Sequence, residues 1–148
     1  MTPPALVSTS RLLAALWLGG GAVLLAVAAP AAFRGAGDPT HAASIVGDML
    51  GQWRYVAIGA PLLLLILAAM RRVGRGPMIV VAVALVLALV QTAVDSRIHR
   101  IRQQSAVPIS SLDRSDPVRR HFGMLHGASS GLMLVQIIAA ASVVWMQE

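Results

Sequence analysis

One segment combines a histidine, two serines and three glycines inside a long apolar run. It extends from Arg119 to Gly131 and places Ser129 and Ser130 about one helical turn after His126. Ionisable residues are costly inside a membrane-spanning helix and usually have a structural or chemical purpose there. His126 is therefore the first candidate for chemistry, either in hydrogen bonding, in ion binding or as a ligand of a cofactor.

A second group of polar residues recurs along the preceding apolar segment, at Gln91, Asp95, His99 and Arg102. Their offsets of 0, 4, 8 and 11 residues place them on one face of an α-helix. Such a face can pair with a neighbouring helix or form a solvated stripe at the helix end. It can also provide a carboxylate to an ion.

The two groups are predicted to meet. If Pro77 and Trp145 mark the same membrane face, Asp95 and His126 each lie about 27–29 Å from it along a helix. They should then be level on neighbouring antiparallel helices. The predicted cluster for a polar ligand or an ion comprises His126, Asp95, His99, Arg54 and Ser130. A purely structural hydrogen-bond network is the alternative, and it is favoured for histidine and serine between membrane helices.

Cofactor chemistry is the runner-up. A bis-histidine haem b held by His126 with His99 or His121 is sound chemistry, and Met124 with Met133 are possible soft ligands for copper. We predict no metal site and no cofactor, because neither histidine partner lies deep in an apolar run. Catalysis is not predicted either, because the serines beside His126 lack the strand-to-helix turn of a nucleophile elbow.

The elements that position these residues follow from composition. The 148 residues are 57% hydrophobic and only 12% charged, about half the charged share of soluble proteins. Four nearly uncharged segments approach the roughly 20 residues that cross a bilayer as a helix, and none alternates as a β-barrel strand would. The predicted fold is all-α, one polytopic bundle of four transmembrane helices at residues 12–33, 53–70, 77–98 and 121–146. The first segment is too long for an ordinary signal peptide, so we expect it to be retained.

Proline and aspartate mark the expected helix boundaries. The Asp-Pro pairs at 38–39 and 116–117 are typical helix starts, an N-cap followed by proline in the first turn. The second and fourth helices should therefore extend beyond the bilayer on one side. We expect the second helix to bend near Gly47 or Gly51, and Pro30 to kink or end the first helix.

The charge of +6 comes from twelve arginines and no lysine, and the chain has no cysteine. Disulfides and thiolate sites are thereby excluded. The arginines lie in loops and at helix ends, where they contact anionic lipid headgroups rather than nucleic acid. Orientation stays open, because eight arginines fall on one side and four on the other, yet the compact basic turn at 71–75 belongs to the smaller group.

Small residues should supply helix packing. In lipid, glycine lets neighbouring backbones approach closely. The predicted packing positions are Gly19, Gly20, Gly123, Gly127 and Gly131. Four short helices offer little room for an internal path, so we expect a homo-oligomer or association with other membrane subunits.

Two stretches of the chain resemble the transmembrane-protein-205-like family, a domain of unknown function. The stretches are LWLGG at 16–20 with APAAFR at 29–34, and FGMLHGASS at 122–130. The resemblance implies a small four-helix integral membrane protein with no established reaction. The positions it marks are Trp17, Gly19, Gly20, Pro30, Phe33, Phe122, His126 and Ser129 or Ser130.

From these observations we expect a non-enzymatic protein of the bacterial inner membrane. It would bind or help move a small solute or ion, or serve as an accessory subunit of a membrane complex. The alternative is a haem- or metal-binding redox protein that uses His126.

Overall fold

The computed structural model describes residues 4–146, which form long helices joined by short turns and one longer loop. The elements are α1 (Pro4–Val23), η1 (Leu24–Ala28), α2 (Ala29–Gly35), α3 (Pro39–Met70), α4 (Arg75–Gln104), η2 (Ile109–Ser111) and α5 (Pro117–Trp145). Within this range there is no strand, and four helical rods are long and apolar enough to cross a membrane. The first rod is α1, η1 and α2 together, and the others are α3, α4 and α5.

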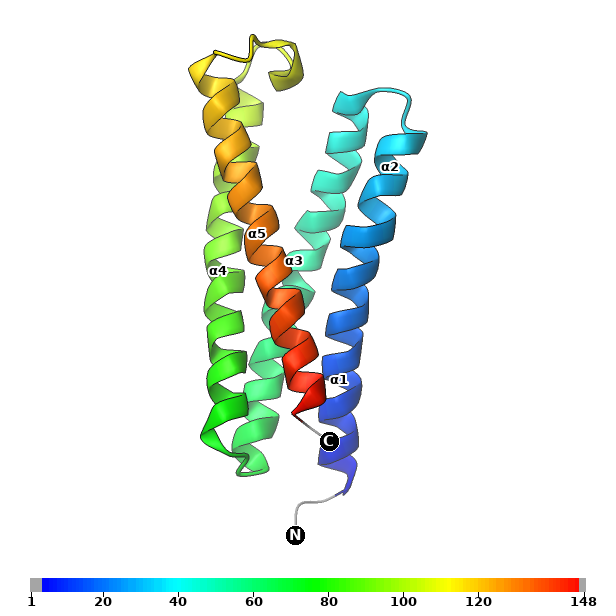
Figure 1. Cartoon of the computed structure of the whole chain (residues 1–148), viewed down its shortest axis with the longest axis vertical. Coiled ribbons are helices and arrows are strands. Elements are labelled where there is room, and N and C mark those ends of the chain that lie inside the picture. The colour runs from blue at the N-terminus through cyan, green and yellow to red at the C-terminus, as the bar shows by residue number, and fades with distance from the viewer. Residues whose placement is uncertain (1–3, 147–148) are drawn as a thin grey trace.

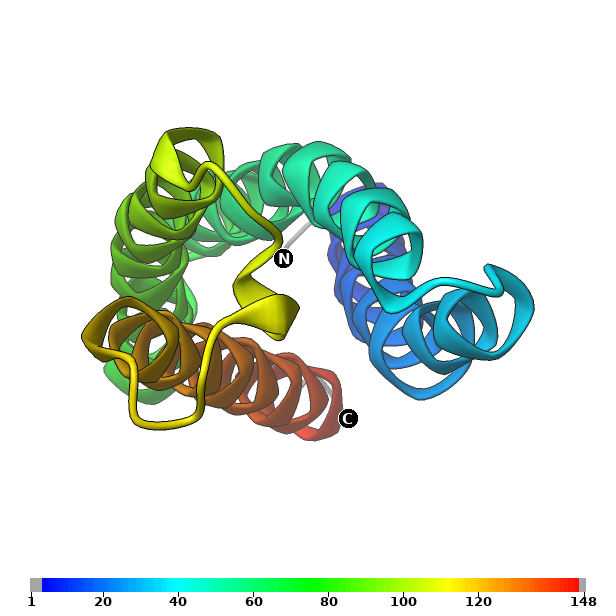
Figure 2. The ribbon, with the colours of Figure 1, turned by 90° about the horizontal axis from the view of Figure 1, so that it is seen from above.

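The four rods alternate in direction and form a bundle that is open at one end (Figure 1). The terminal end holds the start of α1, the α3–α4 turn and the end of α5, and there α5 lies beside α1. The loop end holds the α2–α3 turn and residues 105–116. Towards the loop end α5 stays beside α4 and diverges from α2, as Figure 2 also shows from above.

The predicted helix starts are confirmed. Asp38 caps α3 by accepting hydrogen bonds from the amides of Thr40 and His41, at 3.2 and 3.0 Å. Asp116 caps α5 in the same way, accepting from Val118 and Arg119 at 2.7 and 3.4 Å. The helices are longer than the predicted apolar segments, because backbone hydrogen bonding continues through charged residues that ended the hydropathy signal.

Glycine and proline were expected to disturb two of the helices. α3 is one continuous helix through Gly47 and Gly51, and the bend expected there stays a prediction. A single glycine lowers helix propensity by only about 1 kcal/mol, which packing of α3 overrides. At Pro30 the first rod continues, but the π-helical η1 precedes it, and the Ala29 amide bonds to the Leu24 carbonyl, five residues back. A wider turn next to proline is a usual way to absorb the missing amide and the ring.

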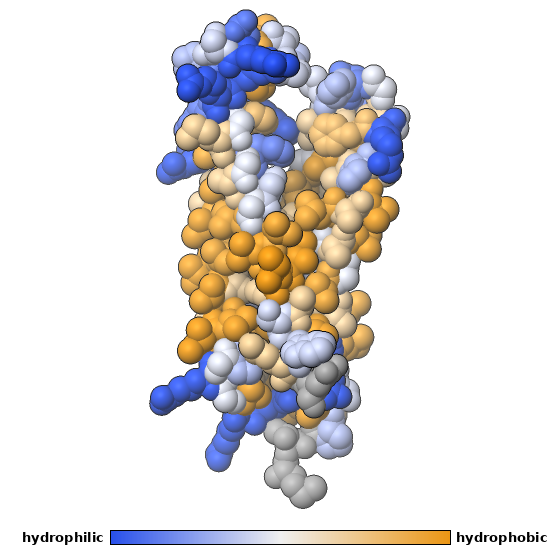
Figure 3. Space-filling model, viewed as in Figure 1, coloured by the Kyte–Doolittle hydropathy of each residue, from blue (hydrophilic) through white to orange (hydrophobic). Residues whose placement is uncertain are grey.

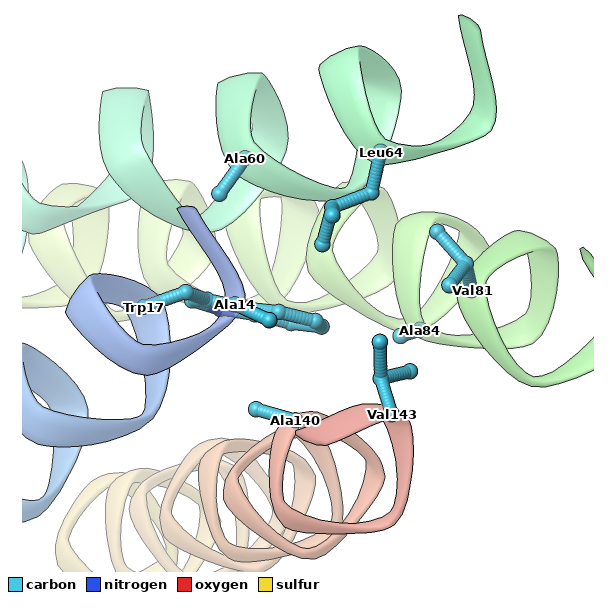
Figure 4. Packing of buried hydrophobic residues seen from close by; sticks show 8 residues of the cluster. All are labelled: Ala14, Trp17, Ala60, Leu64, Val81, Ala84, Ala140 and Val143. Carbon is cyan, nitrogen blue, oxygen red and sulfur yellow. The ribbon is translucent and has the colours of Figure 1, made fainter. Parts of the chain in front are cut away.

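The core lies at the terminal half of the bundle, where all four rods meet. Each rod turns one row of residues inward at alternating spacings of three and four, the period of coiled-coil seams. The buried cluster consists of Ala14, Trp17, Ala60, Leu64, Val81, Ala84, Ala140 and Val143. Figure 4 shows the Trp17 side chain extending from α1 between the other helices. In this cluster one large ring therefore packs among alanines and aliphatic side chains.

The loop at 105–116 is folded back onto the start of α5. Asp113 accepts from both the amide and the hydroxyl of Ser115, at 2.8 and 2.6 Å. The guanidinium of Arg119 donates to the carbonyls of Ser110 and Leu112. The two Ser115 bonds, aided by the charge of Arg119, lower the pKa of the Asp113 carboxyl below its usual value.

Candidate functional site

The inward row of α4 changes from apolar to polar along its length. Towards the terminal end it consists of Val81, Ala84 and Ala88, and towards the loop end of Gln91, Asp95, Ile98 and Arg102. The facing row of α5 changes likewise, from Val143 and Ala140 to Gln136, Met133 and Ser129. The polar residues of these two rows form a ladder between α4 and α5, which we call the polar ladder.

The first rung is a pair of buried amides. Gln136 Nε2 donates to Gln91 Oε1 at 2.6 Å and to the carbonyl of Leu132 at 3.3 Å. The two glutamines are only 4% and 7% exposed. This pair joins α4 to α5 directly above the apolar core. Sequence reasoning missed Gln136, although its spacing of seven from Ser129 would have placed both on one helix face.

The second rung holds the carboxylate of Asp95. Ser129 Oγ donates to Asp95 Oδ1 at 2.6 Å, and His126 is near enough to interact with Asp95 electrostatically. Ser129 is buried and Asp95 half-buried. The structure therefore brings Asp95 and His126 near each other, as the depth argument predicted. The hydroxyl at the site belongs to Ser129, whereas Ser130 is exposed.

The third rung is Arg102, which links three helices near the loop end. Its Nη1 donates to the carbonyl of Ala43 in α3 at 3.1 Å. Its guanidinium carbon lies 5.4 Å from the centre of the Phe122 ring in α5, within the range of a cation–π contact. A Cβ at Gly47 would lie 3.3 Å from Nη1, so glycine leaves the room that the guanidinium occupies.

Besides Ser130, two further members of the predicted cluster lie elsewhere. His99 is exposed, and its Nε2 is 2.9 Å from Gln103 Nε2 on its own helix. Arg54 is exposed too, donates to the Tyr55 hydroxyl at 2.9 Å and stacks over that ring. The period of the row explains why His99 is outside it: the row runs through Gln91, Asp95, Ile98 and Arg102 in alternating steps of four and three, so the step after Asp95 is three residues. His99 lies one residue, or about 100° of helix rotation, away.

The residues proposed for cofactors are not gathered at one site, and the histidines among them are all exposed. His121 and His99 are exposed, and so is His126, whose ring stacks on Phe122 at a centroid distance of 6.2 Å. Over residues 4–146 no three or more His, Cys, Asp or Glu side chains gather as metal ligands. Met133 is 4% exposed and Met124 is 72% exposed. The two methionines lie nine residues apart, which is two and a half helical turns, so their side chains leave α5 on opposite sides and the structure does not bring these thioethers together.

The predicted packing glycines divide into two kinds. A Cβ at Gly20 would lie 2.7 Å from the Trp53 ring, so this glycine does pack a helix closely. Gly21, which sequence reasoning missed, faces Ile137 at 3.2 Å. The other four are Gly19, Gly123, Gly127 and Gly131, and each would place a Cβ with none of the described atoms within 4 Å. Among the described residues these four glycines therefore make no close helix contact, and their packing against another subunit stays a prediction.

The buried amide pair should be energetically coupled. We expect Gln136→Leu to lower the free energy of unfolding by about 1–3 kcal/mol, because the Gln91 amide loses its partner while staying buried. Adding Gln91→Leu should restore part of the loss, with a coupling energy of about 0.6–1.7 kcal/mol, the range for interhelical bonds in membranes. Reversible unfolding in mixed micelles measures the cycle. The exposed Gln52→Leu is the control, and simple additivity of the two core changes would contradict the coupling.

Comparison with known proteins assigns no identity to this arrangement. No family model, no curated protein and no solved structure matches the chain.

Proposed function

We propose that this chain is an integral membrane protein that binds a small cation at Asp95, taken from the bilayer face at the loop end. The observation that carries the proposal is the setting of the carboxylate. It lies on the inward row of an apolar rod and is held by a neutral hydroxyl rather than by a guanidinium. A carboxylate in such a rod is costly unless a partner neutralises it.

Insertion in a bilayer is supported by the outer surface. Large apolar side chains project from all four rods, among them Leu12 and Leu16 at 62%, Ile79 at 61% and Ile138 at 57% exposed. Figure 3 displays an apolar middle between two polar ends, on the face in view. Exposed apolar surface of this extent is typical of contact with lipid.

The oxygen atoms at the second rung suit a hard cation. An ionised carboxylate can accept about four hydrogen bonds, and Ser129 supplies one to Asp95. The lone pairs of the Ser129 hydroxyl stay available, because it acts as the donor in that bond. Arg102, the nearest arginine on the same inward row, is directed to Ala43 and Phe122. Carboxylate, hydroxyl and amide oxygens bind sodium-like cations, and the carboxylate also accepts a proton.

The path to the site is one-sided. Below Asp95 the Gln91–Gln136 pair closes the space between α4 and α5, and the buried apolar cluster follows. An ion would lose its hydration among those side chains without replacement. The chain by itself therefore favours binding from the loop end over conduction along the bundle axis.

The test uses full-length protein in non-ionic detergent. At constant ionic strength, we expect the melting temperature to rise when sodium or potassium is added or when the pH is lowered. The Asp95→Asn substitution should abolish this rise. A ligand at 100 times its dissociation constant stabilises the folded state by about 2.7 kcal/mol. Asp48→Asn, an exposed aspartate in α3, is the matched control and should retain the response. An unchanged response in Asp95→Asn would refute cation binding at this residue.

A second proposal concerns partners. Gly123, Gly127 and Gly131 recur at four-residue spacing on α5, and all three are exposed and open. A ridge of this kind lets another membrane helix approach closely. It supports an accessory-subunit or oligomeric role, which is compatible with the family resemblance and with cation binding. Crosslinking in native membranes, with and without Gly127→Leu, tests it.

A further inference from the structure

We propose that the terminal end of the bundle contains a binding site for a phosphoryl anion, in the cavity beside Arg71. The cavity measures about 140 Å³ and is lined by all four rods. Ser10 comes from α1, Leu64 from α3, Val81 from α4 and Val143 from α5. This site lies at the opposite end of the bundle from Asp95. The proposal therefore does not depend on cation binding at Asp95.

The guanidinium of Arg71 is only partly satisfied. Its Nη1 donates to the Ser10 hydroxyl. Its Nε is buried and has no hydrogen-bond partner among the described residues. A buried donor without a partner costs about 1–3 kcal/mol, and more for a charged group. The edge of the guanidinium that begins at Nε is the fork that binds phosphate or carboxylate with two parallel hydrogen bonds.

The surroundings of this edge favour an anion. Pro77 lines the cavity in the first turn of α4, a 30-residue helix with no side-chain cap at Gly74. The N-terminus of a helix carries a partial positive charge and free amides, which attract anions. The other lining residues are apolar apart from Ser10, and within residues 4–146 no acidic side chain lines the cavity. Among the described residues the cavity therefore offers Arg71 no opposite charge, and an anion would supply one.

The volume and position point to a phosphoryl group. The cavity of about 140 Å³ is large enough for several water molecules, and therefore for a group of the size of phosphate. The terminal end also carries Arg72 and Arg75, both exposed in the turn beside the cavity. Exposed arginines of this kind mark the headgroup level of a bilayer. The phosphoryl group can come from a lipid headgroup or from free phosphate in solution.

Thermal unfolding of full-length protein in non-ionic detergent tests the site, with two ligands titrated separately. One is inorganic phosphate, with chloride at equal ionic strength as reference. The other is short-chain phosphatidylglycerol, with a neutral glycolipid as reference. We expect a saturable rise in melting temperature with at least one of them. Arg71→Gln should weaken the apparent affinity by about tenfold or more, the effect of losing charge-assisted hydrogen bonds.

Two further variants make the result specific. Arg72→Gln removes the same charge from the exposed neighbour and should leave the titration within about twofold of wild type. Arg71→Lys keeps the charge but loses the fork. Arg71→Lys should weaken binding clearly, so the site can still be tested if the Arg71→Gln protein does not fold. A response to the lipid alone identifies a headgroup site, and a response to phosphate alone a soluble anion. No response to either, or an undiminished response in both Arg71 variants, overturns the proposal.

Discussion

Replacing Trp17 by alanine should lower the free energy of unfolding by about 3 kcal/mol, the largest effect that we expect from one substitution. Trp17 is 3% exposed and extends between the rods among Ala14, Ala60 and Ala84. Truncating a buried tryptophan typically costs about 3–5 kcal/mol. The lower figure applies because unfolded helices in a membrane keep the side chain in lipid, so the cavity and the lost contacts carry the cost.

Trp145 provides the matched control for this experiment, because it is 77% exposed on α5. Trp145→Ala should change the free energy of unfolding by no more than about 0.5 kcal/mol. Reversible unfolding in mixed micelles, followed by circular dichroism, measures both variants. Equal losses for the two tryptophans would contradict the assignment of Trp17 to the core.

Sequence patterns predicted the elements well, because long apolar helices leave strong signals. Apolar segments of sufficient length and the Asp-Pro caps located all four rods. The apolar segments alone gave boundaries that were too short, since hydropathy reports where the apolar sequence ends rather than where backbone hydrogen bonding ends. α1 illustrates this, because it begins at Pro4, whereas the predicted segment begins at residue 12.

The candidate site was predicted only in part, and the reason is rotational. Depth along two helices brought Asp95 near His126, because rise per residue is fixed. Which side chains turn inward depends on how each helix is rotated, and this is set by packing with all neighbours. A shift of one residue exchanges His99 for Ile98 and Ser130 for Ser129. The sequence did contain one indication of how α4 is rotated. Ala84 and Ala88 continue the three-and-four spacing of the inward row, and both are buried.

The direction in which the glycines of α5 face also depends on how the helix is rotated. Glycine at four-residue spacing predicts a smooth ridge, but it does not say what the ridge meets. On α5 the inward row is occupied by Ser129, Met133 and Gln136. Gly127 and Gly131 lie two residues before and after Ser129, or about 200° away around the helix. They face away from the bundle, whereas Gly20 and Gly21 on α1 pack closely against other rods.

Gly20→Ala should destabilise the protein by about 1–3 kcal/mol, the cost of inserting a methyl group into a close contact. A Cβ at this position would lie 2.7 and 2.9 Å from two atoms of the Trp53 ring. A rigid indole cannot yield as the end of a flexible side chain can, so α1 and α3 must move apart. The relaxation would also disturb Gly21, whose Cβ position lies 3.3 Å from the same ring.

Gly19→Ala separates this steric effect from helix propensity. The two glycines are neighbours in one helix, but a Cβ at Gly19 has no described atom within 4 Å. Alanine is the better helix former by about 0.5–1 kcal/mol, so Gly19→Ala should be neutral or stabilising. The same gain in propensity operates at Gly20, and a net loss there isolates the clash with Trp53. Unfolding in mixed micelles gives the two values, and tryptophan fluorescence reports the displaced ring. If both substitutions stabilise the protein, α1 and α3 do not approach at Gly20 as the structure has them.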